Sequence, residues 1–148
     1  MADLLWIAQT AEIALSADVE KTVMQIVAPA NQRLKVLRWG IYFDGTVVTA
    51  EPAQVRLLRQ TTAGTMSSLT PVKIGTASET IQASAYHTAT AEPTAGDVLD
   101  MAECHIQGGY EVIFPIGQDI KIPGGGRLGI AINSPSAVNV RAKIVVEE

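Results

Sequence analysis

The stretch "IPGGGRLGIAINSP", from Ile122 to Pro135, decides between two fold classes. Its glycines Gly124, Gly126 and Gly129 match the G-x-G-x-x-G spacing of dinucleotide-binding proteins. That fingerprint works only between a strand and a helix, because the helix N-terminus must face the pyrophosphate. Here Gly129 is followed by a short alternating apolar segment and a proline, which predict a strand and then a turn. We therefore expect a glycine-rich hairpin turn that binds no nucleotide and no other cofactor.

The same two-residue alternation runs through most of the chain. Residues 37–43, 110–116 and 138–146 place apolar side chains at every second position. Turn signals such as Asp44-Gly45 separate these segments. About eight to ten short strands at near-regular spacing are typical of an all-β sandwich or barrel. The parity of the strands predicts a two-sheet core made of Leu37, Trp39, Ile41, Val55, Leu57, Val112, Phe114, Leu128, Ile130, Val140 and Ile144.

Length and composition fit a single domain with few charged residues. The chain has 148 residues, of which 47% are hydrophobic and 18% charged, with a net charge of −4. An acidic chain has no electrostatic footprint for nucleic acid or an anionic membrane, so neither is expected as a partner. Asp3 stands where a signal peptide carries positive charge, and no apolar run approaches a membrane span. The domain prediction is residues 1–19 as an N-terminal arm or first strand, followed by a β-sandwich over residues 20–148.

The residues that most often carry chemistry do not form a catalytic pattern. Cys104 and His105 are adjacent, and adjacent side chains on a strand point to opposite faces, so they do not easily share a metal with His87. Cys104 falls in the apolar row and is expected in the core. The acids Asp97, Asp100 and Glu103 lack the spacing of a calcium loop, and no serine lies in a G-x-S-x-G motif. We expect no enzyme, no catalytic residues and no metal site.

Several longer segments of the sequence resemble those of a known group of proteins. These are "KTVMQIVAPANQRLKVLRWGIYFDGT" (Lys21 to Thr46), "AEPAQVRLLRQTTAGTMSSLTPVKI", "HTATAEPTAGDVL" and "QGGYEVIFPIGQDIKIPGGGRLGIAINSPSAVNVRAKIVVEE". They resemble the capsid decoration (cement or auxiliary head) proteins of tailed bacteriophages, over most of the chain beyond about residue 20. The resemblance implies an antiparallel β-sandwich of jelly-roll type. It also implies a homo-oligomer, commonly a trimer, that binds the major capsid protein on the outer capsid surface of the virion after synthesis in the host cytoplasm.

The N-terminal segment "LLWIAQTAEIAL" suggests where such an oligomer is held together. An exposed apolar arm is costly unless it pairs with a neighbouring sheet edge. We therefore expect an extended N-terminal arm whose assembly interface is Leu4, Leu5, Trp6 and Ile7. Deletion of residues 1–15 is then expected to weaken assembly while the sandwich stays folded. The alternative function is a virion surface or tail module that recognises host glycans, although aromatic residues make up only 5% of the chain.

Overall fold

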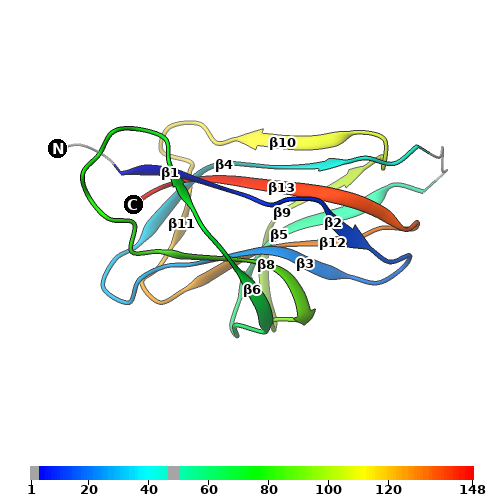
Figure 1. Cartoon of the computed structure of the whole chain (residues 1–148), viewed down its shortest axis with the longest axis horizontal. Helices are drawn as coiled ribbons and strands as arrows, with labels where there is room; N and C mark the ends of the chain where they lie inside the picture. The colour runs from blue at the N-terminus through cyan, green and yellow to red at the C-terminus, as the bar shows by residue number, and fades with distance from the viewer. Residues whose placement is uncertain (1–3, 47–50) are drawn as a thin grey trace.

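The protein folds as two antiparallel β-sheets packed face to face (Figure 1). A computed structural model describes residues 4–46 and 51–148, and none of these residues is helical. The seven-stranded sheet contains, in spatial order, β10 (Gly109–Ile113), β4 (Leu34–Phe43), β13 (Val138–Glu147), β1 (Leu5–Gln9) and β7 (Val72–Lys73), with β11 (Ile120–Ile122) also paired to β4 and β2 (Ile13–Leu15) also paired to β13. The six-stranded sheet contains, in spatial order, β6 (Thr65–Leu69), β8 (Ser84–Ala91), β3 (Lys21–Val27), β12 (Arg127–Asn133), β5 (Ala53–Gln60) and β9 (Ala95–Cys104).

The core lies between the two sheets, as the alternation predicts. The all-β sandwich is confirmed, and eight of the predicted core residues are buried: Trp39, Ile41, Val55, Leu57, Leu128, Ile130, Val140 and Ile144. Val112 and Phe114 are partly buried against the same cluster. The Trp39 ring meets the ring of Tyr110 edge-on, with 5.4 Å between their centroids. The interior is therefore a continuous apolar layer built from both sheets.

Leu37 is the exception among the predicted core residues, and a β-bulge explains it. The pairing of β4 with β13 skips from Arg38 to Val36, so Leu37 has no partner in the register. The extra residue reverses the parity of β4 on that side. Val36 is consequently fully buried, and Leu37 is only half-buried. Strict alternation from Trp39 would put Val36 on the opposite face, and the bulge brings it into the core.

The N-terminal segment is part of the sandwich, and the prediction of an extended arm is wrong for the residues that the structure describes. β1 pairs antiparallel with β13, from Leu5 opposite Glu147 to Gln9 opposite Lys143, and also with β7. β2 pairs with the first part of β13. Both strands bury apolar side chains, and their backbone groups form hydrogen bonds with β13 that a free arm would lack. β1 is therefore an internal strand where Trp6 and Ile7 pair with β7, and β2 continues along β13 alone.

One extra residue between β1 and β2 explains why the alternation breaks at Gln9. Gln9 lies opposite Lys143 and Ile13 lies opposite Val140, so three residues on one strand face two on β13. The parity therefore flips, and the inward side chains change from even positions in β1 to odd positions in β2.

The glycine-rich stretch is a corner between the sheets, and the prediction of a hairpin is wrong. β11 belongs to the seven-stranded sheet and β12 to the six-stranded sheet, so the chain changes layers at Pro123–Gly126. Gly125 has a φ of 73°, a conformation that favours glycine. A Cβ at Gly124 would lie 2.6 Å from the carbonyl oxygen of Ala30. A strand follows the glycines, so the stretch lacks the helix N-terminus that holds a pyrophosphate.

Candidate functional site

The four residues predicted to form the assembly interface divide into two pairs. Leu4 and Trp6 face the core, where Trp6 is fully buried and its indole Nε1 donates to Glu148 Oε2 at 3.1 Å. Leu5 and Ile7 alternate with them and are half-buried on the outer side of the sheet. Leu4 and Trp6 therefore cannot reach a neighbouring molecule while β1 stays in its sheet.

Exposed apolar side chains occur instead along the two strands that end the sheets on one side, with Met101 on the outer face of the six-stranded sheet and Ile113 on the outer face of the seven-stranded sheet. β9 ends the six-stranded sheet and β10 ends the seven-stranded sheet, and the turn after Cys104 joins them. Asp100 closes this edge, because its Oδ2 lies 3.3 Å from Trp39 Nε1 and 3.5 Å from the Tyr110 hydroxyl. We name as the β9/β10 edge the exposed residues of these strands and of the loop that follows β10: Val98, Leu99, Met101, Ile113 and Ile116.

The opposite lateral edge carries a smaller apolar group. β6 and β7 end the two sheets there, and only two residues of chain separate them. Val72 is 60% exposed and Ile74 is 52% exposed, with Lys73 between them in the sequence. Val72, Lys73 and Ile74 are called the β6/β7 edge below. Within residues 4–46 and 51–148, each of these end strands pairs with a neighbour on one side only, so each edge combines open strand backbone with aliphatic side chains, the usual composition of a surface for strand-edge contacts.

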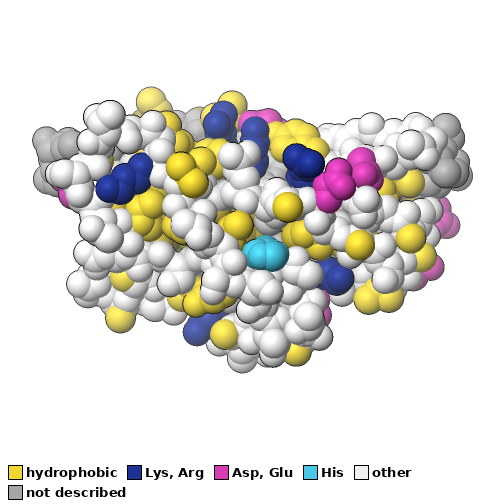
Figure 2. Space-filling model, in the orientation of Figure 1, with side chains coloured by type: hydrophobic (Ala, Val, Ile, Leu, Met, Phe, Trp, Pro, Cys, Tyr) yellow, Lys and Arg dark blue, Asp and Glu magenta, His cyan; other side chains and the backbone are white. Residues whose placement is uncertain are grey.

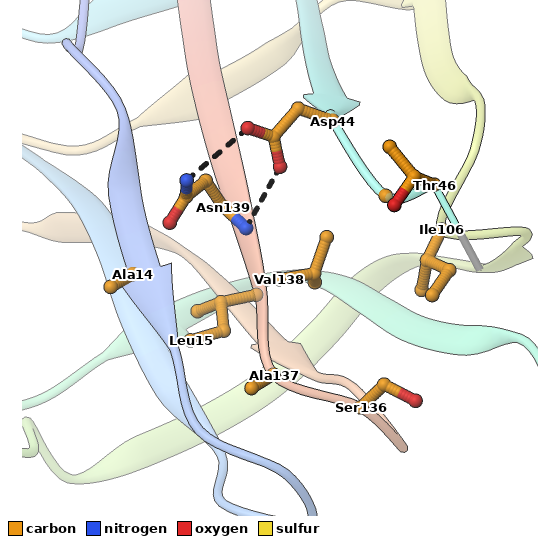
Figure 3. A pocket seen from close by; sticks show the side chains of 10 residues that line it. Ala14, Leu15, Asp44, Thr46, Ile106, Ser136, Ala137, Val138 and Asn139 are labelled. Carbon is orange, nitrogen blue, oxygen red and sulfur yellow. Dashed lines mark hydrogen bonds between the residues drawn. The ribbon is translucent and has the colours of Figure 1, made fainter.

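A pocket of about 420 Å³ lies where β2, the end of β4 and the start of β13 meet (Figure 3). Its polar wall is Asp44, which accepts hydrogen bonds from the backbone nitrogen of Asn139 at 3.0 Å and from Asn139 Nδ2 at 3.2 Å. Both carboxylate oxygens therefore have partners already. The remaining labelled walls include Leu15, Ile106 and Val138, so this pocket is a largely apolar hollow beside a capped strand end.

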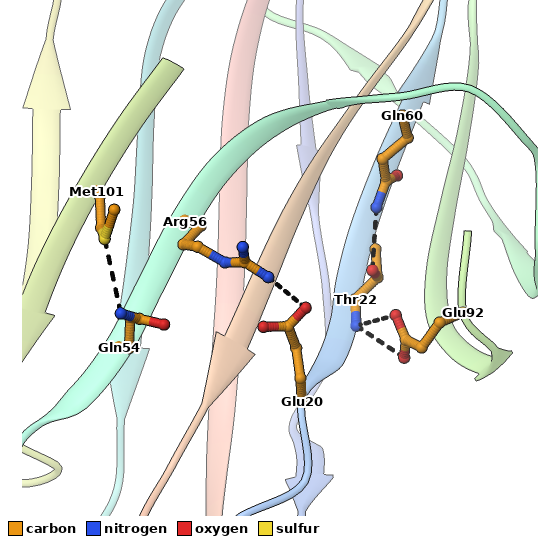
Figure 4. Close-up of polar contacts among 7 residues, drawn as sticks. All are labelled: Glu20, Thr22, Gln54, Arg56, Gln60, Glu92 and Met101. Atoms are coloured by element: carbon orange, nitrogen blue, oxygen red, sulfur yellow. Dashed lines mark hydrogen bonds and ion pairs between the residues drawn. The ribbon is translucent and has the colours of Figure 1, made fainter. Parts of the chain in front are cut away.

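The outer face of the six-stranded sheet carries a row of buried polar side chains (Figure 4). Gln60 Nε2 donates to Thr22 Oγ1 at 3.0 Å, and the backbone nitrogen of Thr22 donates to both carboxylate oxygens of Glu92. Arg56 forms an ion pair with Glu20 beside this row. These contacts join β3, β5 and the end of β8, so the face is held by polar bonds that cross strands.

Gly129 has a structural role in the same row. It lies on β12 between β3 and β5, and a Cβ there would come within 2.3 Å of Gln60 Oε1. The missing side chain lets the Gln60 amide cross β12 and reach Gln25 Nε2, which donates to it at 2.7 Å. The last glycine of the apparent nucleotide fingerprint thus serves side-chain packing.

The outer face of the seven-stranded sheet carries a cluster of charges around Glu111. Its carboxylate accepts a hydrogen bond from the Tyr42 hydroxyl and lies 3.4 Å from Lys143 Nζ and 3.8 Å from Arg38 Nη1. The Tyr42 hydrogen bond, followed by the neighbouring cations, lowers the pKa of Glu111. The hydrogen bond with Tyr42 and the charge of Glu111 raise the pKa of Lys143. Both shifts favour the charged forms, so the cluster stabilises the sheet at neutral pH.

The residues considered as catalytic or metal-binding candidates have different structural roles and do not converge on one site in the part of the chain that the structure describes. Cys104 is buried in the core as its parity predicts, and burial raises the pKa of its thiol, which is the opposite of an activated nucleophile. Asp100 closes the sandwich edge, whereas Asp97 and Glu103 are exposed on β9. Across residues 4–46 and 51–148, no three His, Cys, Asp or Glu side chains gather as a metal site, and no helix has the length and apolarity needed to cross a membrane.

Neither a protein family, nor a curated protein, nor a solved structure matches this chain. Function must therefore be inferred from the fold and its surface. Figure 2 shows one face of the molecule on which charged side chains are sparse and apolar side chains occur in several groups between polar atoms. The two lateral edges were not found from the sequence, because "VLDMAECHI" mixes acids with apolar residues and fits helix and strand equally.

Proposed function

We propose that the protein is a structural virion protein that forms a ring-shaped homo-oligomer, most simply a trimer, and decorates the outer surface of a phage capsid. The observation that carries the proposal is the pair of lateral edges with exposed apolar residues, on a sandwich that buries its other apolar side chains in one core cluster. Such edges are a liability for a monomer and are resolved by contact with another chain. The resemblance of the sequence to decoration proteins of tailed phages supplies the capsid as the partner.

The strand order supports a jelly-roll topology. If β6, β7 and β8 are taken as an insertion and β2 and β11 as continuations of β1 and β10, the sheets reduce to β1-β13-β4-β10 and β3-β12-β5-β9. Along the chain these eight strands alternate between the sheets, except where β5 is followed by β9. This is the order of two interlocked Greek keys, which defines a jelly roll. The insertion extends both sheets on one side and creates the β6/β7 edge.

The composition of the two edges favours head-to-tail contact between copies. Asp97 and Glu103 flank the apolar residues of β9, so antiparallel pairing of β9 with its own copy brings acids together. The β6/β7 edge includes one cation, Lys73, whose Nζ donates to the backbone oxygen of Ala77 at 3.0 Å. Contact between two different surfaces builds a ring when the rotation closes. Several identical copies on one shell then bind with avidity.

Co-sedimentation with capsid shells tests this function. Shells assembled from the major capsid protein of the same phage are mixed with the wild type, with Met101→Lys and with Val19→Lys. Val19 is 52% exposed and belongs to neither edge, because it lies in the turn between β2 and β3, so it is the matched control. We expect the wild type and Val19→Lys to pellet with shells and Met101→Lys to bind less. Failure of the wild type to pellet contradicts capsid decoration.

The alternative, a virion-surface module that binds host glycans, is favoured by one observation. A small pocket on the outer face of the six-stranded sheet is lined by Tyr86, Gln25 and Arg127.

A further inference from the structure

The segment between β6 and β8 crosses from one sheet to the other and back. β7 pairs with β1 in the seven-stranded sheet, whereas β6 and β8 belong to the six-stranded sheet. In Figure 1 this segment, drawn in green, loops around the end of the sandwich where both chain termini lie before it returns to β8. We call residues 72–83 the strap. The strap carries the β6/β7 edge, because Val72, Lys73 and Ile74 are its first three residues.

Few contacts hold the strap against the rest of the described chain. β7 pairs with two residues of β1, and the backbone nitrogen of Ile74 donates to the backbone oxygen of Leu5 at 2.9 Å. Ala77 and Ile81 are partly buried against the core. A hollow of about 460 Å³ is lined by Leu5 and by residues 74–79 of the strap, so this part is not closely packed. Segments with few hydrogen bonds and little buried apolar surface open locally at low free-energy cost.

The end of the strap is held by the side chain of Glu148. Its Oε1 accepts a hydrogen bond from the backbone nitrogen of Gln82 at 2.9 Å, and its Oε2 accepts one from the backbone nitrogen of Ala83 at 3.4 Å. Oε2 also accepts from the indole Nε1 of Trp6 at 3.1 Å. One carboxylate therefore joins the strap to a fully buried residue of β1. Hydrogen bonds to a charged acceptor are stronger than those between neutral groups.

We propose that the Glu148 carboxylate holds the strap closed and that the strap opens from β1 as one unit. Opening breaks the bond between Ile74 and Leu5 together with the bonds to Glu148, and it displaces the β6/β7 edge. The consequence for assembly rests on the proposed function. A neighbouring copy binds the β6/β7 edge only while the strap is closed, so the fraction of closed molecules sets the apparent affinity between copies.

Residue-resolved amide hydrogen exchange, measured by NMR on the full-length protein, tests whether Glu148 controls the strap. Glu148→Ala removes the acceptor of the Gln82 amide, so faster exchange there reports only one lost bond. The informative probe is the amide of Ile74, which bonds to Leu5 rather than to Glu148. We expect Ile74 to exchange about tenfold faster in Glu148→Ala, in line with the loss of hydrogen bonds to a charged group, and the amides of β4 to change less.

Glu147→Ala is the matched control, because Glu147 is the neighbouring residue and its carboxylate forms an ion pair with Lys35 of β4. This variant is expected to leave the exchange of Ile74 unchanged. The proposal is overturned if Glu148→Ala accelerates only Gln82 and Ala83. It is also overturned if Ile74 and the β4 amides accelerate by the same factor, since the chain then opens as a whole.

Light scattering on the same samples separates the strap from the proposed function. We expect the Glu148→Ala oligomer to dissociate at a higher protein concentration than the wild type, since fewer molecules have a closed strap. Dissociation at the wild-type concentration, despite faster exchange of Ile74, overturns the link between the strap and assembly. A monomeric wild type contradicts the proposed function and this link with it, whereas the exchange comparison still decides whether Glu148 holds the strap.

Discussion

Trp6→Ala is the substitution that best separates an internal strand from a free arm. Trp6 is fully buried in β1, and its Nε1 donates to Glu148 Oε2. Replacing a buried tryptophan by alanine costs about 3–5 kcal/mol through lost transfer energy and the cavity left behind. That loss is a large fraction of the about 5–15 kcal/mol that stabilises a typical domain. We expect the free energy of unfolding to fall by about this amount.

The assay is equilibrium urea denaturation followed by circular dichroism at several protein concentrations, because oligomerisation adds concentration-dependent stability. Ile7→Ala is the matched control, since Ile7 is the next residue, on the outer side of the sheet, and only half-buried. It is expected to cost about 1 kcal/mol. The reasoning is refuted if Trp6→Ala leaves the unfolding midpoint unchanged and lowers only the oligomer mass, because that is the behaviour of an arm.

Three further predictions concern Gly129, Glu111 and the glycine-rich corner. Gly129→Ala is expected to cost about 1–3 kcal/mol in urea denaturation, because its Cβ displaces the buried Gln60 amide. Gly75→Ala, which meets nothing within 4 Å, is expected to cost less than about 0.5 kcal/mol. The Tyr42 hydrogen bond lowers the pKa of Glu111, so its contribution to stability is full above about pH 4.3 and is lost as the pH falls through the lower folded pKa. Glu111→Gln is therefore expected to flatten the acid decline of the urea midpoint, and parallel profiles contradict this. Calorimetric titration with NAD or ATP is expected to show no heat of binding, and micromolar affinity abolished by Gly126→Val contradicts it.

Periodicity predicts much of the sandwich because each strand buries one face. Trp39, Ile41, Leu57 and Ile130 alternate with outward residues and are all fully buried. The Asp44-Gly45 turn signal likewise marks the end of β4 at Phe43. These features depend on neighbours within one strand, which a single sequence contains.

The predictions that are wrong concern features set by pairing between distant segments. One extra residue at Leu37 and another between Gln9 and Ile13 reverse the parity of their strands, and each bulge exists only against β13. An apolar segment such as residues 4–9 is equally suited to a free arm and to a central strand, and pairing with β13 decides between them.

The surface features could not be predicted from the sequence for a similar reason. Gln25 and Gln60 are 35 positions apart, and nothing local indicates that their amides meet over Gly129. The outward side chains of β9 become significant only when that strand is placed at the end of a sheet. Their exposure follows from topology and does not follow from hydrophobicity.

The mass of the purified protein in solution tests the central claim most directly. We expect light scattering to show a closed oligomer, most simply a trimer with three times the 15.7 kDa mass of one chain. Met101→Lys and Ile113→Lys are expected to shift it to the monomer while the circular dichroism spectrum stays all-β, and Val19→Lys is expected to leave the oligomer intact. A wild type that remains monomeric at high micromolar concentration, or an oligomer that survives both edge substitutions, contradicts assembly through the lateral edges.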